Sequence, residues 1–146
     1  MSYQHFLVEI TEGVATVAFN RPDKANALHQ AAWDELPMVF NALHEEETVR
    51  VIVLSGTGNH FCAGIDLGLL MSLQSFNDLD CEARKREKLL AFIRKLQQAI
   101  NAIEAGNKPV IAAIHGACVG GGLDIAAACD MRFCSADARF SVKEID

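Results

Sequence analysis

The sequence lacks the features that mark membrane, secreted and organelle-targeted proteins. No run of apolar residues approaches the roughly 18 residues that a membrane-spanning helix needs. Residues 1–10, "MSYQHFLVEI", have neither the basic start and long apolar core of a secretory signal nor the Arg- and Ser-rich composition of a transit segment. We therefore expect a soluble cytoplasmic protein with no membrane partner.

Basic side chains are scarce as well. The 146 residues include 13 Lys and Arg against 19 Asp and Glu, which gives a formal net charge of −6. Beyond one local run at positions 84–88, the basic residues form no stripe. Because binding to phosphate groups requires clustered Lys and Arg, nucleic acid is not an expected partner.

The cysteines follow neither a disulfide pattern nor a zinc pattern. There are five, an odd number, at positions 62, 81, 118, 129 and 134, and no two are spaced as CxxC. This usage is typical of reduced thiols in a cytosolic protein. His115 and Cys118 lack a second pair of ligands at a zinc spacing, so we predict no metal site.

Three common nucleotide-binding and nucleophile motifs are also missing. A dinucleotide fingerprint that starts at Gly120 and Gly122 would need Gly or Ala where the chain has Ile125. No lysine follows the glycines as a phosphate loop requires, and no G-x-S-x-G elbow occurs anywhere. Nucleotide binding and serine-nucleophile chemistry are therefore not indicated.

An alternation of strand and helix patterns is present. The strands are expected at 5–10, 14–19, 49–56, 109–116 and 131–136, and the helices at 30–46, 65–73, 82–105 and 121–130. Residues 74–80 are the least patterned stretch. The apolar runs at 49–56 and 109–116 are typical of strands covered on both faces. This order predicts one α/β domain over residues 1–146, with a mostly parallel sheet flanked by helices.

The two apolar strands end in similar glycine-containing loops. "VIVLSG" leads into "GTGNHFCAGID", and "VIAAIHG" leads into "ACVGGGLD". Ligands of α/β sheets gather at the carboxyl ends of strands, where the first N–H groups of the next helix lack partners. Two such N–H groups directed at one oxygen would form an oxyanion hole. The alternative, that the glycines only allow close packing of helix on strand, stays open at this point.

Three segments carry a resemblance to a known family. "NRPDKANAL", "FCAGIDL" and residues 108–146 look like the crotonase superfamily of enoyl-CoA hydratases and isomerases. The resemblance implies a crotonase-like α/β fold built as a spiral of strand–strand–helix units. It also implies acyl-CoA thioesters as substrates, no further cofactor, and assembly into homotrimers or hexamers. Relatives of this kind continue into a helical C-terminal part, so residues 1–146 are expected to be an incomplete N-terminal core domain.

The resemblance also implies positions for the site. The backbone N–H groups of Ile65 and Gly121 would bind the thioester oxygen as the oxyanion hole. The remaining substrate-binding positions that it implies are Ala63, Gly64, Asp66 and Leu67, with Lys24 and Ala25 near the adenine end of CoA.

Two acids decide which branch of the superfamily the chain resembles. Hydratases usually carry glutamates at both positions, whereas this chain has Asp124 and Glu144. That combination looks more like Δ3,5-Δ2,4-dienoyl-CoA isomerases, in which carboxyl groups tuned by burial move a proton between carbons 2 and 6. Glu144 would be one shuttle group, and Asp124 would orient its partner or the substrate. The second shuttle acid would follow Asp146, so we expect the isolated chain to be poorly active.

Other readings of these residues remain. The chain is alternatively an enoyl-CoA hydratase, or a non-catalytic acyl-CoA-binding homologue. Asp124 is alternatively a first-turn acid favoured by the helix dipole, and Glu144 a solvated charge. Asp66 suits a helix-capping acid better than a catalytic one. Asp130 and Arg132 are expected to pair with each other.

Overall fold

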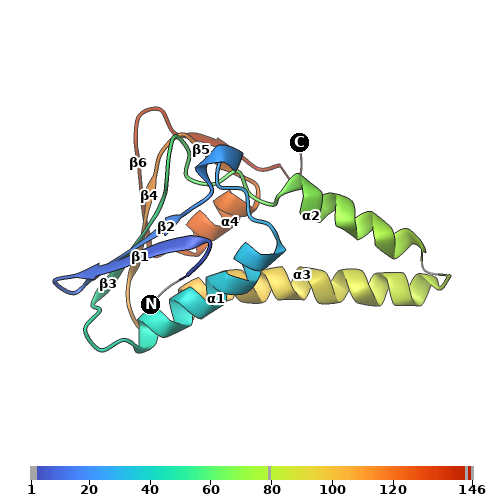
Figure 1. Cartoon of the computed structure of the whole chain (residues 1–146), viewed down its shortest axis with the longest axis horizontal. Coiled ribbons are helices and arrows are strands. Elements are labelled where there is room, and N and C mark those ends of the chain that lie inside the picture. Colours follow the sequence, from blue (N-terminus) through green and yellow to red (C-terminus); the bar gives the residue numbers. More distant parts are fainter. Residues whose placement is uncertain (1–2, 79, 144, 146) are drawn as a thin grey trace.

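The computed structural model describes residues 3–78, 80–143 and 145. Its strands are β1 (Phe6–Thr11), β2 (Val14–Phe19), β3 (Val51–Gly56), β4 (Val110–Ile114), β5 (Ala117–Val119), β6 (Met131–Cys134) and β7 (Arg139–Ser141). Its α-helices are α1 (Gln30–Glu45), α2 (Leu67–Ser72), α3 (Glu82–Glu104) and α4 (Gly121–Ala128), and short 3₁₀ helices span Pro22–Lys24 and Leu73–Asp78. Figure 1 shows this order along the chain.

The main sheet has five strands in the order β1-β2-β3-β4-β6. β1 and β2 are antiparallel, and the pairs β2–β3, β3–β4 and β4–β6 are parallel. The β1–β2 hairpin turns at Glu12 and Gly13, whose φ values of 51° and 85° give the left-handed backbone that two-residue hairpin turns need. The strands predicted at 5–10 and 14–19 and the mostly parallel sheet are confirmed.

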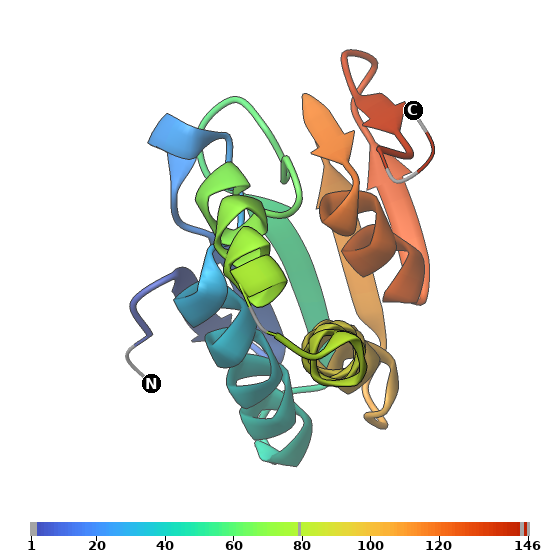
Figure 2. The ribbon, with the colours of Figure 1, turned by 90° about the vertical axis from the view of Figure 1, so that its right-hand side faces the viewer.

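The helices pack against one face of this sheet, which is where the core lies (Figures 1 and 2). Inward-facing Ile52 and Leu54 of β3 are fully buried, as are Leu36 and Phe40 of α1. The alternate residues of β3 are only partly buried. The expectation that the apolar strands are covered on both faces is therefore wrong for the described part of the chain, because its helices all lie on the same side.

The long helix α3 is buried at only one end. Ala99, Ala102 and Ile103 pack in the core, whereas Leu89 and Ile93 are 43% and 41% exposed. The first half of α3 projects from the sheet beside α2 and the 3₁₀ helix at 73–78 (Figure 1). The helix predicted over residues 82–105 is confirmed, but the apolar side chains of its first half are largely exposed in the described part of the chain. No helix in this part of the chain is both long enough and apolar enough to cross a membrane.

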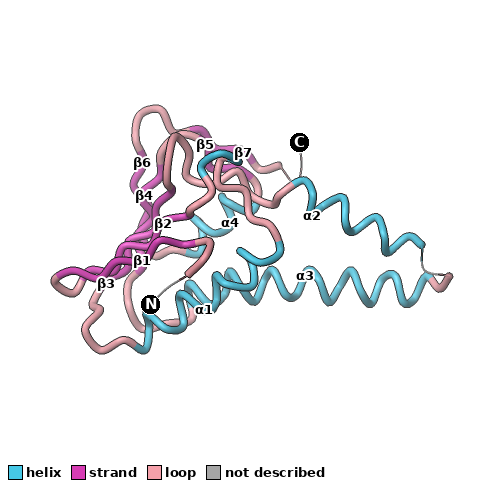
Figure 3. Tube along the Cα trace, in the orientation of Figure 1, coloured by secondary structure: helices cyan, strands magenta, loops and turns pink. Residues whose placement is uncertain are grey.

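A small second sheet was missed by the sequence patterns. β5 and β7 pair in parallel, with Cys118 opposite Phe140 (Figure 3). Both strands are only three residues long, too short for a two-residue alternation to stand out. The pairing matters locally, because the Gly120 N–H donates to the Ser141 carbonyl at 3.0 Å. The C-terminal segment therefore holds the loop that precedes α4.

The predicted ion pair between Asp130 and Arg132 is wrong. Asp130 instead accepts a hydrogen bond of 2.7 Å from the Val110 N–H, at the start of β4. Arg132 donates to the carbonyls of Ala126 and Ala127 at the end of α4. A cation at a helix C-terminus is favoured by the helix dipole, which explains this arrangement better than a pair of neighbours.

Candidate active site

The two glycine loops that follow β3 and β4 meet in space. Gly64, in the first loop, has a φ of 82° and packs against the second loop so closely that a Cβ atom there would lie 2.6 Å from the Val119 oxygen. The same Cβ atom would lie 2.9 Å from the Gly121 nitrogen. A parallel β-bridge, formed by backbone hydrogen bonds and not by a disulfide, joins Cys62 to Cys118 and ties the two loops together. The predicted oxyanion donor Gly121 therefore directly adjoins Gly64, which is the residue before the second predicted donor, Ile65.

The direction of the Ile65 amide follows from its neighbours. The Leu28 N–H donates to the Gly64 carbonyl at 2.8 Å, and the Asp66 N–H donates to the Leu28 carbonyl at 3.0 Å. Successive peptide groups of an extended segment point to opposite sides, so the Ile65 N–H points away from Leu28. Neither the Ile65 nor the Gly121 N–H has a hydrogen-bond acceptor in the part of the chain that the structure describes.

A different structural constraint requires glycine at each of the three consecutive positions 120–122, where α4 begins. Gly120 has φ 50° and ψ −125°, a backbone conformation that side chains disfavour. A Cβ atom on Gly121 would lie 3.1 Å from Cζ2 of Trp33, and one on Gly122 would lie 2.4 Å from the Cys62 carbonyl oxygen. Close packing and a special backbone conformation are thus both required. The explanation that the glycines only allow close packing accounts for Gly122 but not for Gly120.

Asn26 holds the connector at residues 20–28 against the first glycine loop. Its side chain is 1% exposed and accepts a hydrogen bond of 2.9 Å from the Arg21 N–H. Its amide nitrogen donates to the carbonyls of Thr57 and His60 at 2.9 and 2.8 Å. Its φ of 57° is left-handed, which Asn tolerates better than most residues. Asn26 therefore fixes the segment whose Leu28 orients Gly64 and Asp66.

Five of the predicted substrate-binding residues line one pocket, whereas Gly121, Gly64 and Ala25 do not. A cavity of about 590 Å³ is lined by Arg21, Lys24, Ala27, Ala63, Ile65, Asp66, Leu67 and Gly68. Ala25 does not line it but accepts a hydrogen bond of 2.9 Å from the Ala63 N–H, and Gly64 is buried beside it. Arg21 was missed, because a single basic residue in a polar connector gives no sequence signal.

Asp66 begins helix α2 rather than facing a reaction partner. Its Oδ1 atom accepts a hydrogen bond of 2.8 Å from the Gly68 N–H, as expected for the capping role. Its Oδ2 atom forms an ion pair of 2.6 Å with Arg21. The hydrogen bond from Arg21, supported by that from Gly68, lowers the pKa of Asp66 below its usual range. Asp66 is therefore a structural carboxylate that joins the connector to α2.

Asp66→Asn is expected to lower the free energy of unfolding by about 1 kcal/mol near pH 7, since Asn keeps a cap acceptor but loses the ion pair. The depressed pKa makes the ionised carboxylate stabilising above its unfolded-state pKa of about 4, and this contribution is lost as the pH falls through the folded-state value. Urea unfolding near pH 7 and in acid measures the difference. Exposed Asp23→Asn is the control, and an equal loss for Asp66→Asn at both pH values would contradict the assignment.

The two predicted catalytic acids are only partly described. Asp124 lies in the first turn of α4, where its N–H donates to the Gly120 carbonyl at 3.1 Å. Its side chain is exposed, and its expected role of orienting a partner or the substrate stays a prediction. Glu144 lies outside the described residues, and so does Asp146.

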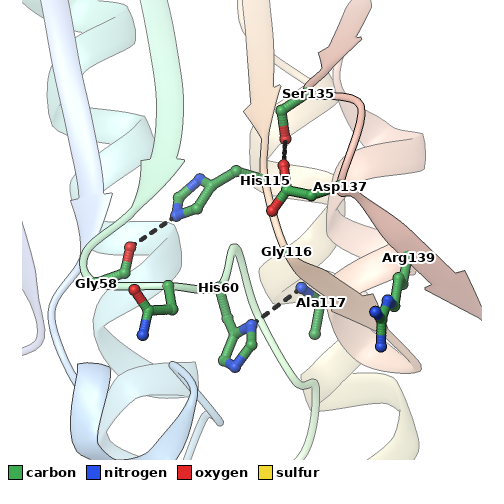
Figure 4. A pocket seen from close by; sticks show the side chains of 9 residues that line it. Gly58, His60, His115, Gly116, Ala117, Ser135, Asp137 and Arg139 are labelled. Atoms are coloured by element: carbon green, nitrogen blue, oxygen red, sulfur yellow. Dashed lines mark hydrogen bonds between the residues drawn. The ribbon is translucent and has the colours of Figure 1, made fainter.

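A second cavity is lined by residues 58–60 and 115–117 of the two glycine loops. It measures about 650 Å³ and includes His60, His115, Ser135, Asp137 and Arg139 (Figure 4). The His60 Nδ1 atom accepts a hydrogen bond of 3.2 Å from the Ala117 N–H, and His115 Nε2 lies 3.0 Å from the Gly58 oxygen. Ser135 hydrogen-bonds Asp137, which lowers the pKa of that carboxyl. These contacts fix the loop backbones and bring in none of the predicted site residues.

The thiols near the site are structural. All five cysteines are free, and Cys62, Cys118 and Cys129 are buried. Burial raises the pKa of Cys62 to about 12 and that of Cys118 to about 11. A thiol with so high a pKa is a poor nucleophile at neutral pH.

Comparison with known proteins places this geometry in a family. The family model for enoyl-CoA hydratase/isomerase matches residues 9–146. The chain is 51% identical over 129 residues to the peroxisomal Delta(3,5)-Delta(2,4)-dienoyl-CoA isomerase of Arabidopsis thaliana, covering 87% of this chain and 46% of the relative. It is 44% identical over 133 residues to the mitochondrial Delta(3,5)-Delta(2,4)-dienoyl-CoA isomerase of Homo sapiens, covering 91% and 40%.

Solved structures agree on the fold. The enoyl-CoA hydratase of Mycobacterium smegmatis matches with a TM-score of 0.83 and 31% identity, over 95% of this chain and 49% of that one. The predicted crotonase-like α/β fold is thereby confirmed, and the chain spans less than half the length of these relatives. Sequence, family model and structure lead to one conclusion: the chain belongs to the enoyl-CoA hydratase/isomerase family.

Proposed function

We propose that the protein isomerises a 3,5-dienoyl-CoA to a 2,4-dienoyl-CoA through an enolate held by the backbone N–H groups of Ile65 and Gly121. The observation that carries the proposal is the approach of Gly64 to the Gly121 nitrogen, beside two amides without acceptors among the described residues. The names of the relatives from Arabidopsis thaliana and Homo sapiens supply the reaction.

The chemistry needs donors that are fixed before the reaction begins. Removal of a proton from carbon 2 moves negative charge onto the thioester oxygen, and preorganised N–H groups stabilise that charge without reorganising. Gly121 is at the N-terminus of α4, so the helix dipole adds to its positive potential. The proton removed at carbon 2 is balanced by one returned at carbon 6, and the two double bonds shift together.

The acids complete the proposal. Glu144 would carry one of the two proton transfers, and Asp124 would orient its partner or the substrate. Proton transfer beside a thioester uses only dipoles and carboxyl groups, so no metal, flavin or nicotinamide enters the mechanism. The CoA moiety would lie along the cavity lined by Lys24, Ala63 and Leu67, where Arg21 adds a second cation.

Assembly and location belong to the same proposal. The homotrimer or hexamer implied by the resemblance stays a prediction, which sedimentation velocity measures. The cytoplasmic location stays a prediction as well, and the relatives named peroxisomal and mitochondrial make an organelle the alternative. Cell fractionation distinguishes the two.

The test uses the protein at the full length that its gene encodes. Isomerisation of a 3,5-dienoyl-CoA is followed by absorbance, with crotonyl-CoA in parallel, and we expect the dienoyl substrate to have the higher kcat/KM. Glu144→Gln should lower kcat about 100-fold while acyl-CoA binding is retained, because it removes a proton-transfer group. Faster turnover of crotonyl-CoA would make the protein a hydratase. Binding without turnover of either substrate would make it a non-catalytic acyl-CoA-binding protein.

A further inference from the structure

Trp33 of α1 packs directly against the backbone of Gly121. Its side chain is 2% exposed. The six-membered ring of the indole is the nearest group to Gly121, since Cζ2 and Cη2 would lie 3.1 and 3.3 Å from a Cβ atom placed there. The Ile65 side chain lies 3.5 Å from the same point. Trp33 and Ile65 therefore both pack on the side of Gly121 to which a side chain would point.

The indole N–H of Trp33 has no hydrogen-bond acceptor among the described residues. Nε1 is buried and has no hydrogen bond in the described part of the chain. A buried donor without an acceptor is destabilising, and a phenyl ring would avoid that penalty. The feature that a tryptophan offers here and a phenylalanine does not is reach, because the contact with Gly121 is made by the outer ring.

Different contacts hold the three glycines that precede and begin α4. Gly120 is fixed by its hydrogen bond to the Ser141 carbonyl, and Gly122 is fixed by packing against the Cys62 carbonyl. Gly121 has no side chain of its own and no hydrogen bond from its N–H among the described residues. The Gly120 carbonyl belongs to the same peptide group as the Gly121 N–H, and it accepts hydrogen bonds from the N–H groups of Leu123 at 2.7 Å and Asp124 at 3.1 Å. The first turn of α4 therefore holds the carbonyl end of this peptide group, and the packing of Trp33 against Gly121 acts at its other end.

We propose that Trp33 is a positioning residue, which holds the Gly121 N–H in place for the substrate oxygen without touching the substrate. The inference rests on the proposed function for its catalytic consequence, whereas the packing contact itself is testable by stability alone. A displacement of about 1 Å at a reacting group lowers turnover by up to ~100-fold.

The first test is kinetic. Trp33→Phe is expected to lower kcat by ~10- to 100-fold with KM changed less than about threefold, because the donor acts on the transition state. Trp33→Tyr extends further than phenylalanine and should restore part of kcat. Phe40→Leu is the matched control, because Phe40 is a buried aromatic residue of the same helix. This variant should have a lower Tm and an unchanged kcat.

The second test is a double-mutant cycle on stability. Gly121→Ala crowds the Trp33 ring, so Trp33→Phe should relieve it, and the loss in Tm of the double mutant should be smaller than the sum of the single losses. Gly122→Ala meets the Cys62 backbone instead, so its combination with Trp33→Phe should be additive.

The outcomes separate the two proposals. A wild-type protein that turns over neither dienoyl-CoA nor crotonyl-CoA overturns the proposed function, and the stability cycle still reports the contact. With an active wild type, a Trp33→Phe kcat equal to that of Phe40→Leu overturns the positioning role. Additivity of Trp33→Phe with Gly121→Ala overturns the contact.

Discussion

Gly64→Ala is expected to lower kcat at least ~1000-fold, because it displaces both proposed oxyanion donors at once. The new Cβ atom would lie 2.6 Å from the Val119 oxygen and 2.9 Å from the Gly121 nitrogen, so the two loops must separate. The φ of 82° adds backbone strain that alanine does not tolerate. Steady-state kinetics with a 3,5-dienoyl-CoA, together with thermal unfolding, measure the effect.

A matched control separates backbone strain from loss of the site. Gly13 has a φ of 85°, close to that of Gly64, but lies in the β1–β2 turn, where a Cβ atom would meet only the Arg50 side chain. Gly13→Ala should therefore lower Tm and leave kcat unchanged. If Gly64→Ala kept a kcat close to that of Gly13→Ala, the two loops would not supply the donors.

Asn26→Ala is expected to lower the free energy of unfolding by about 3 to 4 kcal/mol. The change leaves the Arg21 N–H and the carbonyls of Thr57 and His60 without their partner, and it places alanine at a φ of 57°. Urea unfolding measures the loss. Because Leu28 orients Gly64 and Asp66, kcat/KM should fall in any protein that still folds.

Exposed Asn20→Ala provides the control for the same connector. Its backbone N–H donates to the His5 carbonyl, and this bond survives the substitution. We expect a change within about 0.5 kcal/mol, as for most surface substitutions. A loss below 1 kcal/mol for Asn26→Ala would show that the connector is held by other contacts.

The sequence predicts most of the elements because their signals are local. The Glu12–Gly13 turn between two β-rich segments marks the hairpin, and the apolar spacing of Trp33, Leu36 and Phe40 marks α1. The strand β7 escapes because its residues become a strand only by pairing with β5. The covering of the sheet by helices on one face only could not be predicted, because a strand has the same apolar sequence whether its second face is fully or partly buried.

The site is predictable only where a motif fixes the backbone. The resemblance points to the two loops that carry Ile65 and Gly121, and the structure packs Gly64 against the Gly121 nitrogen; the oxyanion role of the two residues stays a prediction. Asn26 and Arg21 escape because a lone polar residue in a connector looks like a solvated loop residue until the loop at 57–60 folds over it. The role of Trp33 escapes for a related reason: its helical spacing predicts a core position but not the glycine it contacts.

The parallel pairing of strands that are far apart in the sequence has a consequence for the order of folding. Helices α1 and α3 consist of local contacts and form quickly, whereas parallel pairing of distant segments is slow because the loop-closure entropy comes first. The loops that carry Ile65 and Gly121 come together only after β3 and β4 lie side by side and Leu28 has joined them. A helical intermediate would therefore lack the proposed oxyanion geometry, and recovery of the proposed activity on refolding should lag behind recovery of helix.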